Sequence, residues 1–119
     1  MVVTADIPRP NPGEVVEFLA QAVPFTELEP SKIEELAHLF SLKLFPKETA
    51  IFRQDVDAVE YFYLIYSGRV RAFLTGPDEA TTLLDFRGAG GYFGALAIIR
   101  GSKANFNVET LEDTLCLEL

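Results

Sequence analysis

The chain has 119 residues, of which 49% are apolar, and a formal net charge of −8 at pH 7. This composition indicates one folded domain with a core of its own and excludes an intrinsically disordered segment. No apolar run approaches the roughly 20 residues of a membrane span, and the acidic charge disfavours nucleic acid and anionic lipid, which are bound through Lys and Arg.

The N-terminal segment shows no targeting pattern. Residues 1–10 hold two prolines and little periodicity, and we interpret them as a tail ahead of a single domain over residues 11–119. The segment lacks the basic and apolar regions of a signal peptide. The single cysteine, Cys116, excludes an internal disulfide and fits a reducing compartment, so we expect a cytoplasmic protein.

Two helices are predicted before any strand. The run Asn11-Pro12-Gly13-Glu14 predicts a helix start with an Asn cap and Pro at the first helical position, and Pro24 ends that element. The run Ser31-Lys32-Ile33-Glu34 has the pattern of a capping box. Behind it comes an apolar stripe at i, i+3, i+4 and i+7, formed by Ile33, Leu36, Ala37 and Phe40.

Short strand-like runs follow Ser41. The stretch 60–74 is rich in aromatic and branched residues and is interrupted at Ser67-Gly68, and further strands are expected at 81–86 and over the alternating residues 115–119. Turn signals recur about every ten residues, as in small sandwiches, barrels and jelly rolls. The sequence therefore predicts a mainly β fold with N-terminal helices.

Few side chains could support catalysis or hold a metal. The only histidine, His38, falls on the polar side of a helix, and Cys116 has no histidine to activate it. Asp55 and Asp57 share a turn, which alone is weak support for a cation site. We therefore expect no catalytic residues, no metal and no enzyme activity.

A glycine-rich segment is the strongest local signal. Four glycines fall within seven residues: Gly88, Gly90, Gly91 and Gly94. Residues 95–99 can form one or two helical turns, whose first amides lack intrahelical partners and can hold an anion. Arg100 and Lys103 are the nearby cations. A plain turn is the alternative interpretation.

The order of these segments resembles the cyclic nucleotide-binding domain family, the regulatory modules of kinases, channels and bacterial transcription activators. The resemblance covers about residues 15–119 and rests on Pro24-Phe25, FYLIYSGRVRAF (62–73), GGYFGALAII (90–99) and VETLEDTLCLEL (108–119). The positions typical of the family are Tyr63, Ile65, Gly68, Phe93, Gly94, Leu96 and Ala97. The resemblance implies a β-roll, or jelly roll, of eight strands with helices before and after it.

In that family the segment resembling 93–108 is the phosphate-binding cassette, with the rough pattern Phe-Gly-Glu-Leu-Ala, a loop, and Pro-Arg-Ala-Ala-Thr-Val. Its short helix offers amides to the cyclic phosphate, its arginine pairs with the phosphate, and its glutamate accepts from the ribose. The pattern is matched at Phe93, Gly94, Leu96, Ala97 and Val108. Four positions depart from it: Ala95 replaces the glutamate, Lys103 the proline, Ala104 the arginine and Asn107 the threonine.

These departures remove two strong contacts to a cyclic nucleotide. Each charge-assisted hydrogen bond contributes about 1.5–3 kcal/mol, so losing both would weaken binding by several powers of ten at about 1.4 kcal/mol per tenfold. Lys103 or Arg100 could supply charge without the bidentate geometry. The resemblance implies a non-catalytic sensor of a nucleotide or another small anion. Its site residues would be Phe93, Gly94, Ala95, Leu96, Ala97, Arg100, Lys103, Ala104, Asn105 and Asn107.

A second function stays open. Phe106 replaces a small residue next to the former arginine position, and a buried ring there would plug the cavity. The chain would then be a ligand-free module for protein–protein contact or homodimerisation.

The resemblance also implies which segments follow this domain in its parent protein. The chain stops at Leu119, where the family's last strand ends, so we expect an excised domain without its C-terminal helices and with a downstream effector domain in the parent protein. Its closing stretch most resembles the N-terminal modules of bacterial signalling proteins that continue into a CBS pair and a nucleotidyltransferase-like region. Glu48 and Asp55-Val56 stand where the family usually has turn glycines.

Overall fold

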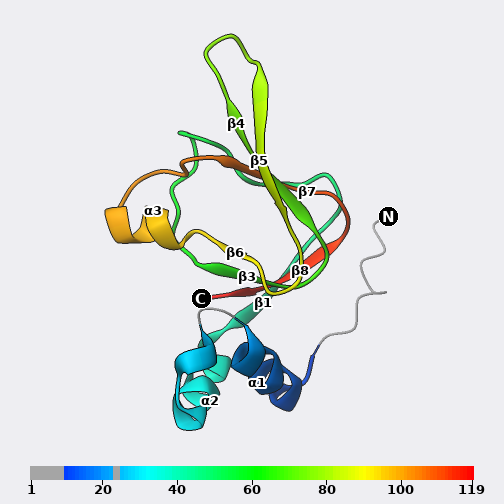
Figure 1. The fold of residues 1–119 in the computed structure, drawn as a ribbon, viewed down its shortest axis with the longest axis vertical. Helices are drawn as coiled ribbons and strands as arrows, with labels where there is room; N and C mark the ends of the chain where they lie inside the picture. The colour runs from blue at the N-terminus through cyan, green and yellow to red at the C-terminus, as the bar shows by residue number, and fades with distance from the viewer. Residues whose placement is uncertain (1–9, 23–24) are drawn as a thin grey trace.

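The computed structural model describes residues 10–22 and 25–119. Residues 1–9 of the predicted tail and Pro24, predicted to end the first helix, lie outside the described residues. Figure 1 shows α1 and α2 together at one end of the molecule, the β4–β5 hairpin extending at the other end, and α3 at the side of the roll.

The first helix begins as the sequence predicts. Helix α1 spans Pro12–Gln21, and Asn11 caps it. The Asn11 side chain accepts a hydrogen bond from the Glu14 amide at 2.8 Å, and the Glu14 carboxylate accepts from the Asn11 amide at 3.0 Å. This reciprocal pair satisfies two amides that a helix start leaves free, so the predicted Asn cap is confirmed.

The second helix begins two residues earlier than predicted, with Glu29 in place of Ser31 as its N-cap. Helix α2 spans Pro30–Leu39, Glu29 is its N-cap, and no side chain caps it, so the predicted capping box at Ser31–Glu34 is wrong. Proline is favoured at a first helical position because its φ is already helical and it has no amide to satisfy. The Glu29 carbonyl instead accepts from the amides of Lys32 and Ile33 at 2.9 and 3.1 Å. A short 3₁₀ turn, η1 (Phe25–Glu27), precedes α2.

Eight strands form two antiparallel four-stranded sheets, which confirms the predicted fold class. The first sheet has the order β1 (Ser41–Phe45), β8 (Thr114–Glu118), β3 (Tyr63–Ser67) and β6 (Tyr92–Phe93). The second has the order β2 (Ala50–Phe52), β7 (Asn107–Thr110), β4 (Val70–Thr75) and β5 (Thr81–Arg87). Helix α3 (Ala95–Arg100) connects the two sheets between β6 and β7.

Two apolar clusters hold these layers together. The roll core fills the space between the two sheets and consists of Phe45, Phe52, Tyr63, Ile65, Val70, Phe93, Ala104, Val108 and Cys116. The base core joins α1, η1 and α2 to the outer face of the first sheet and consists of Val15, Leu19, Ala22, Phe25, Ile33, Leu64 and Leu117. Neighbouring residues of β8 thus enter different cores, because successive side chains of a strand point to opposite faces.

The hairpin of β4 and β5 contains a shift in register. Ala72 faces Asp85 across the pair, whereas the next residue, Phe73, faces Leu83. Leu84 is the extra residue of this bulge. Side chains directly opposite each other share a face, so the bulge places Asp85 on the inner face and Leu83 on the outer face.

Two turns keep a left-handed backbone without glycine. Glu48 has φ of 63° and Asp55 has φ of 60°. These are positions at which the family resemblance leads one to expect glycine, since only glycine adopts this conformation without a steric cost. Both turns therefore adopt a glycine-type backbone with another residue in place.

None of the described helices has the length and hydrophobicity that crossing a bilayer requires.

Candidate functional site: the cassette between β6 and β7

The corner between β6 and α3 depends on a glycine. Gly94 is the N-cap of α3 and has φ of 99°. A Cβ atom there would lie 2.7 Å from the Tyr61 carbonyl oxygen, so a side chain would both strain the backbone and displace the facing chain. The predicted short helix after the glycines is thus confirmed, and its N-cap lies close to the loop before β3.

Helix α3 presents an apolar surface to solvent. Its one buried residue is Ala97. Leu96 and Ile98 are exposed, and Ile99 keeps 81% of its surface accessible. Ala95, at the position of the family's glutamate, carries only a methyl group and cannot accept a hydrogen bond from a ribose.

The loop after α3 is fixed to the turn at residues 55–58. The Ala104 amide donates to the Asp57 carbonyl at 2.9 Å, and the Ala104 carbonyl accepts from the Asp55 amide at 2.9 Å. Asp57 is in turn paired with Arg53, whose guanidinium lies 2.8 Å from the carboxylate, and the hydrogen bonds from Arg53 hold the pKa of Asp57 below its ordinary value. The two aspartates therefore serve a turn. Ala104, at the arginine position, is buried and directs no charge into the site.

Asn107 has a structural role in this geometry. Its carbonyl oxygen accepts from the Gln54 amide at 2.9 Å. Its amide nitrogen donates to Thr75 Oγ1 at 2.9 Å, to the Phe73 carbonyl at 3.2 Å and to Gln54 Oε1 at 3.3 Å. The side chain thereby joins β7 to β4 and to the β2–β3 loop, and its polar atoms already have partners within the chain.

The space inside the cassette is almost filled. The cavity there measures about 10 Å³ and is lined by Phe52, Gly94, Ala97, Ala104, Asn105 and Phe106. A volume of about 10–15 Å³ is the least that holds one water molecule. The Phe106 ring is half-buried and packs against the roll core. The space is therefore far too small for a nucleotide as the lining side chains, among them Phe106, now lie.

One cation that the sequence analysis did not single out lies beside Phe106. The Arg87 guanidinium carbon is 5.2 Å from the centroid of the Phe106 ring. Its Nε donates to Asp85 at 3.0 Å, and its Nη1 donates to the Tyr92 carbonyl at 2.9 Å. The alternation of residues 81–86 did not reveal that the Arg87 side chain faces inward, because the bulge at Leu84 changes which residues of β5 face inward.

The cations proposed from the sequence lie further outside. Arg100 and Lys103 are both exposed, and neither forms an ion pair with another residue of the described ranges. Lys103 does take part in a single β-bridge to Ala58. The corner thus brings Phe93, Gly94, Ala97, Ala104 and Asn105 together, while both long cationic side chains extend into solvent.

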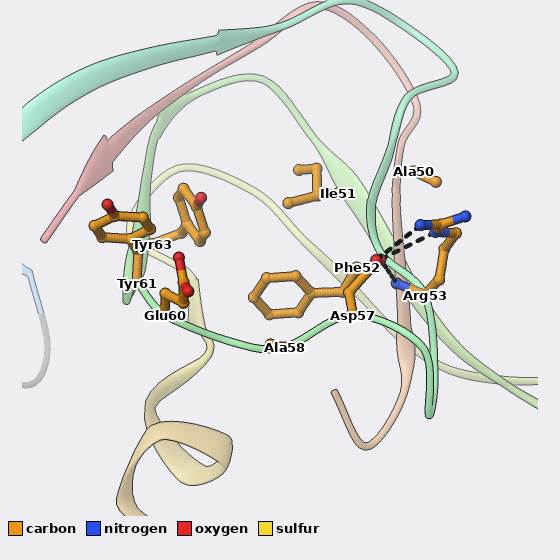
Figure 2. A pocket seen from close by; sticks show the side chains of 9 residues that line it. All are labelled: Ala50, Ile51, Phe52, Arg53, Asp57, Ala58, Glu60, Tyr61 and Tyr63. Carbon is orange, nitrogen blue, oxygen red and sulfur yellow. Dashed lines mark hydrogen bonds and ion pairs between the residues drawn. The ribbon is translucent and has the colours of Figure 1, made fainter. Parts of the chain in front are cut away.

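A larger hollow lies on the other side of Phe52. It has a volume of about 590 Å³ and is lined by Ala50, Ile51, Phe52, Arg53, Asp57, Ala58, Glu60, Tyr61 and Tyr63. Figure 2 shows Tyr61, Tyr63 and Glu60 on one side of it and the Arg53–Asp57 pair on the other. The Tyr63 hydroxyl donates to Glu118 at 2.7 Å, and burial, followed by the Glu118 contact, raises the pKa of Tyr63. This hollow shares only Phe52 with the cassette cavity.

The remaining candidates for chemistry are separate from the cassette. His38 is exposed on α2. Cys116 is buried in β8, and that burial raises the pKa of its thiol to about 12. Across residues 10–22 and 25–119, no three His, Cys, Asp or Glu side chains are grouped as metal ligands.

The sequence matches a known family and a known receptor. The profile described as "Cyclic nucleotide-binding domain" matches residues 42–119. Over 95 residues the chain is 30% identical to the "Cyclic AMP receptor protein" of Thermus thermophilus, and the match covers 80% of this chain and 44% of that protein. The chain therefore spans less than half the length of this relative.

Solved structures show the same architecture. The regulatory domain of Toxoplasma gondii PKA with cAMP superimposes with a TM-score of 0.85 at 22% identity, covering 91% of this chain and 41% of that one. A regulatory subunit of a cAMP-independent protein kinase A from Trypanosoma cruzi, bound to guanosine, gives a TM-score of 0.83 at 19% identity, covering 91% and 38%. Together with the eight-stranded roll and the Gly94 corner, the profile match over residues 42–119 shows that this chain belongs to the cyclic nucleotide-binding domain family.

Proposed function

We propose that this chain is a regulatory, non-catalytic module that senses a nucleotide or another small anion at its cassette and binds cyclic AMP only weakly. The observation that carries the proposal is the combination of an intact Gly94 corner with a cavity of about 10 Å³. The corner is the family's means of presenting backbone amides, and the closed cavity opposes a ligand of nucleotide size.

The side-chain chemistry supports weak binding of cyclic AMP. Ala95 and Ala104 replace a carboxylate and a guanidinium with methyl groups. A ligand would also have to displace the Phe106 ring from the roll core, which costs the burial of that apolar surface. An anion must in addition overcome the net charge of −8, so local donors have to outweigh the general field.

The ligand would be held mainly by the backbone around 94–96, with Arg100 or Lys103 closing over it from solvent. Both cations are exposed, so their long side chains are free to reorient toward the site.

We also propose a cytoplasmic location and a place ahead of an effector domain in a bacterial signalling protein. The match to under half of a cyclic AMP receptor protein is in keeping with such a larger parent.

Calorimetric titration with cyclic AMP and cyclic GMP tests the proposal. We expect no micromolar binding to the unaltered chain, and measurable binding after Phe106→Ala, because truncation opens the cavity. Micromolar binding of either ligand to the unaltered chain would contradict weak cyclic nucleotide recognition. Circular dichroism before each titration shows that the variant is folded.

A second candidate is a ligand-free interaction module. The exposed apolar side chains of α3, Leu96, Ile98 and Ile99, favour it, because such side chains next to one another on a surface often mark a protein contact. Under this function Phe106→Ala shows no shift in melting temperature with any nucleotide, whereas a liganded site shows one. Sedimentation of the chain at increasing concentration would reveal self-association.

A further inference from the structure

We infer that Arg87, on β5, is the residue that binds the negative charge of this module's ligand, and that Phe106, which packs against it, must move aside for that ligand. The inference rests on the proposed sensing function and names the cation that replaces the missing cassette arginine. The ligand class is a phosphate-bearing nucleotide.

The position of Arg87 in the sheet points its side chain into the roll. Arg87 lies opposite Val70, which belongs to the roll core. Opposite residues of an antiparallel pair share a face, so the Arg87 side chain leaves the strand on the inner side. Its contact with Phe106, one of the residues lining the cassette cavity, shows where the guanidinium ends.

The neighbouring arginines of β4 and its turn serve as a contrast. Arg69 lies 4.9 Å from the centroid of the exposed Phe86 ring, and Arg71 pairs with Glu109 at 2.7 Å. Arg71 faces Glu109 across the sheet and lies next to the inward-facing Val70, so it leaves the outer face. Arg87 is the cation of this hairpin that reaches the cassette.

The existing contacts of Arg87 leave it able to bind an anion. A guanidinium has five donor hydrogens, and the bonds to Asp85 and Tyr92 use Nε and Nη1. Asp85 is half exposed, and such an ion pair is weak in water. The Arg87 side chain keeps a quarter of its surface accessible. A phosphate can therefore compete with Asp85 for the guanidinium.

The contact with Phe106 also indicates the shape of the ligand. A guanidinium packs face-on against aromatic rings while its edge donates hydrogen bonds. In this structure Phe106 supplies the ring. A nucleotide that displaces Phe106 would bring its base into the vacated space and its phosphate within reach of the guanidinium edge.

The test uses Phe106→Ala as the open background and compares Arg87→Gln with Arg69→Gln. Cyclic AMP and cyclic GMP are the anionic probes, and adenosine and guanosine are the neutral ones. In calorimetry, Arg87→Gln should weaken nucleotide binding by at least about tenfold, the loss of one charge-assisted hydrogen bond. Nucleoside binding should change little, Arg87→Lys should recover part of the loss, and Arg69→Gln should match the background.

Each other outcome decides against the inference in a different way. Unchanged nucleotide binding in Arg87→Gln overturns the inference and leaves the proposed function intact. Equal losses for nucleotides and nucleosides assign Arg87 a purely structural role, which also overturns it. Absence of binding by every probe in the open background contradicts the proposed function and the inference together. If Phe106→Ala does not fold, Phe106→Val provides the background, and if Arg87→Gln does not fold, Arg87→Lys carries the comparison.

Discussion

Strands β8 and β5 are of similar length but have opposite surroundings. Four of the five residues of β8 are buried, because the roll core covers one face of the strand and the base core covers the other. In β5, which lies at the edge of the second sheet, every residue except Arg87 is exposed. Because buried apolar side chains stabilise a fold, the side chains of β8 contribute more to the free energy of unfolding than those of β5.

The cassette shows the same contrast between features that pack against the roll and side chains that do not. The parts that it keeps are backbone features packed against the roll, such as the Gly94 corner and the two hydrogen bonds of Ala104. At the two positions where the resemblance leads one to expect a glutamate and an arginine, Ala95 and Ala104 carry only methyl groups. The backbone features contribute to the packing of the roll, whereas neither alanine supplies a polar group to a ligand.

The largest expected effect comes from truncating leucines in the two contrasting strands. Leu117 is 1% exposed and packs in the base core, so Leu117→Ala should lower the free energy of unfolding by about 2–5 kcal/mol. Leu83 on β5 is 50% exposed, and Leu83→Ala should cost less than about 1 kcal/mol. Urea denaturation measures both values. Equal losses would break the comparison between the strands.

The next effect concerns the cassette corner. Gly94→Ala combines a positive φ with a contact of 2.7 Å to the Tyr61 oxygen, whereas Gly101→Ala has φ of 62° and open space around the new methyl group. The left-handed backbone costs an alanine about 1–2 kcal/mol. Gly101→Ala should show this cost alone, and Gly94→Ala should exceed it. Similar melting temperatures for the two variants would mean that the corner is not held against the core.

A smaller loss is expected at Asn107. Asn107→Ala removes four hydrogen bonds and leaves the Gln54 amide and the Phe73 carbonyl without this partner, for about 1–3 kcal/mol. Asn105→Ala is the matched control, since Asn105 has no such network among the described residues and should stay within about 0.5 kcal/mol of the unaltered chain. Hydrogen exchange at β7 would localise the loss. An Asn107 variant as stable as the control would contradict the structural role of its amide.

The smallest effect tests whether the first sheet excludes water. Burial raises the pKa of Cys116 from 9.0 to about 12, so between these values the unfolded chain has lost a proton that the folded chain keeps. The contribution of this thiol is fully present below pH 9 and is lost between about pH 9 and 12, by at most about 1.4 kcal/mol per pH unit and by about half of that between pH 8.5 and 9.5. Denaturation of the unaltered chain and of Cys116→Ala at pH 8.5 and 9.5 measures it. Parallel losses in both would show that the thiol is not responsible.

Local sequence patterns predicted much of the fold. The Asn11 cap is visible in four residues because its bonds are local, and the strand runs after Ser41 show their period in the sequence. The Ser31 capping box failed because Pro30 is a competing start signal with a fixed φ. The burial of both faces of β8 could not be predicted from its alternation, since it depends on helices far away in the sequence.

The sequence predicted the glycine corner and the short helix of the site, whereas the contacts of its side chains became visible only in the structure. The glycines located the corner, and the replaced residues at Ala95 and Ala104 were visible directly. Arg87, which we infer to bind the ligand's charge, lies one residue beyond the predicted strand 81–86, and its inward direction follows from a one-residue bulge that inverts the parity of the strand. Asn107 was expected to line the site, but bonds to residues more than thirty positions away give it a structural role that spacing does not reveal.

The anchoring on both sides of Phe106 sets how fast this module could respond. Ala104 is hydrogen-bonded to the turn at 55–58, and Asn107 is bonded to β4, so the backbone around the ring is held at two nearby points. Opening would then be a rotation about the side-chain bonds of one residue, without the slower displacement of a whole loop. Side-chain rotation is faster than loop displacement, so for the ligand that we propose the lifetime of the complex would be determined by the ligand's own dissociation.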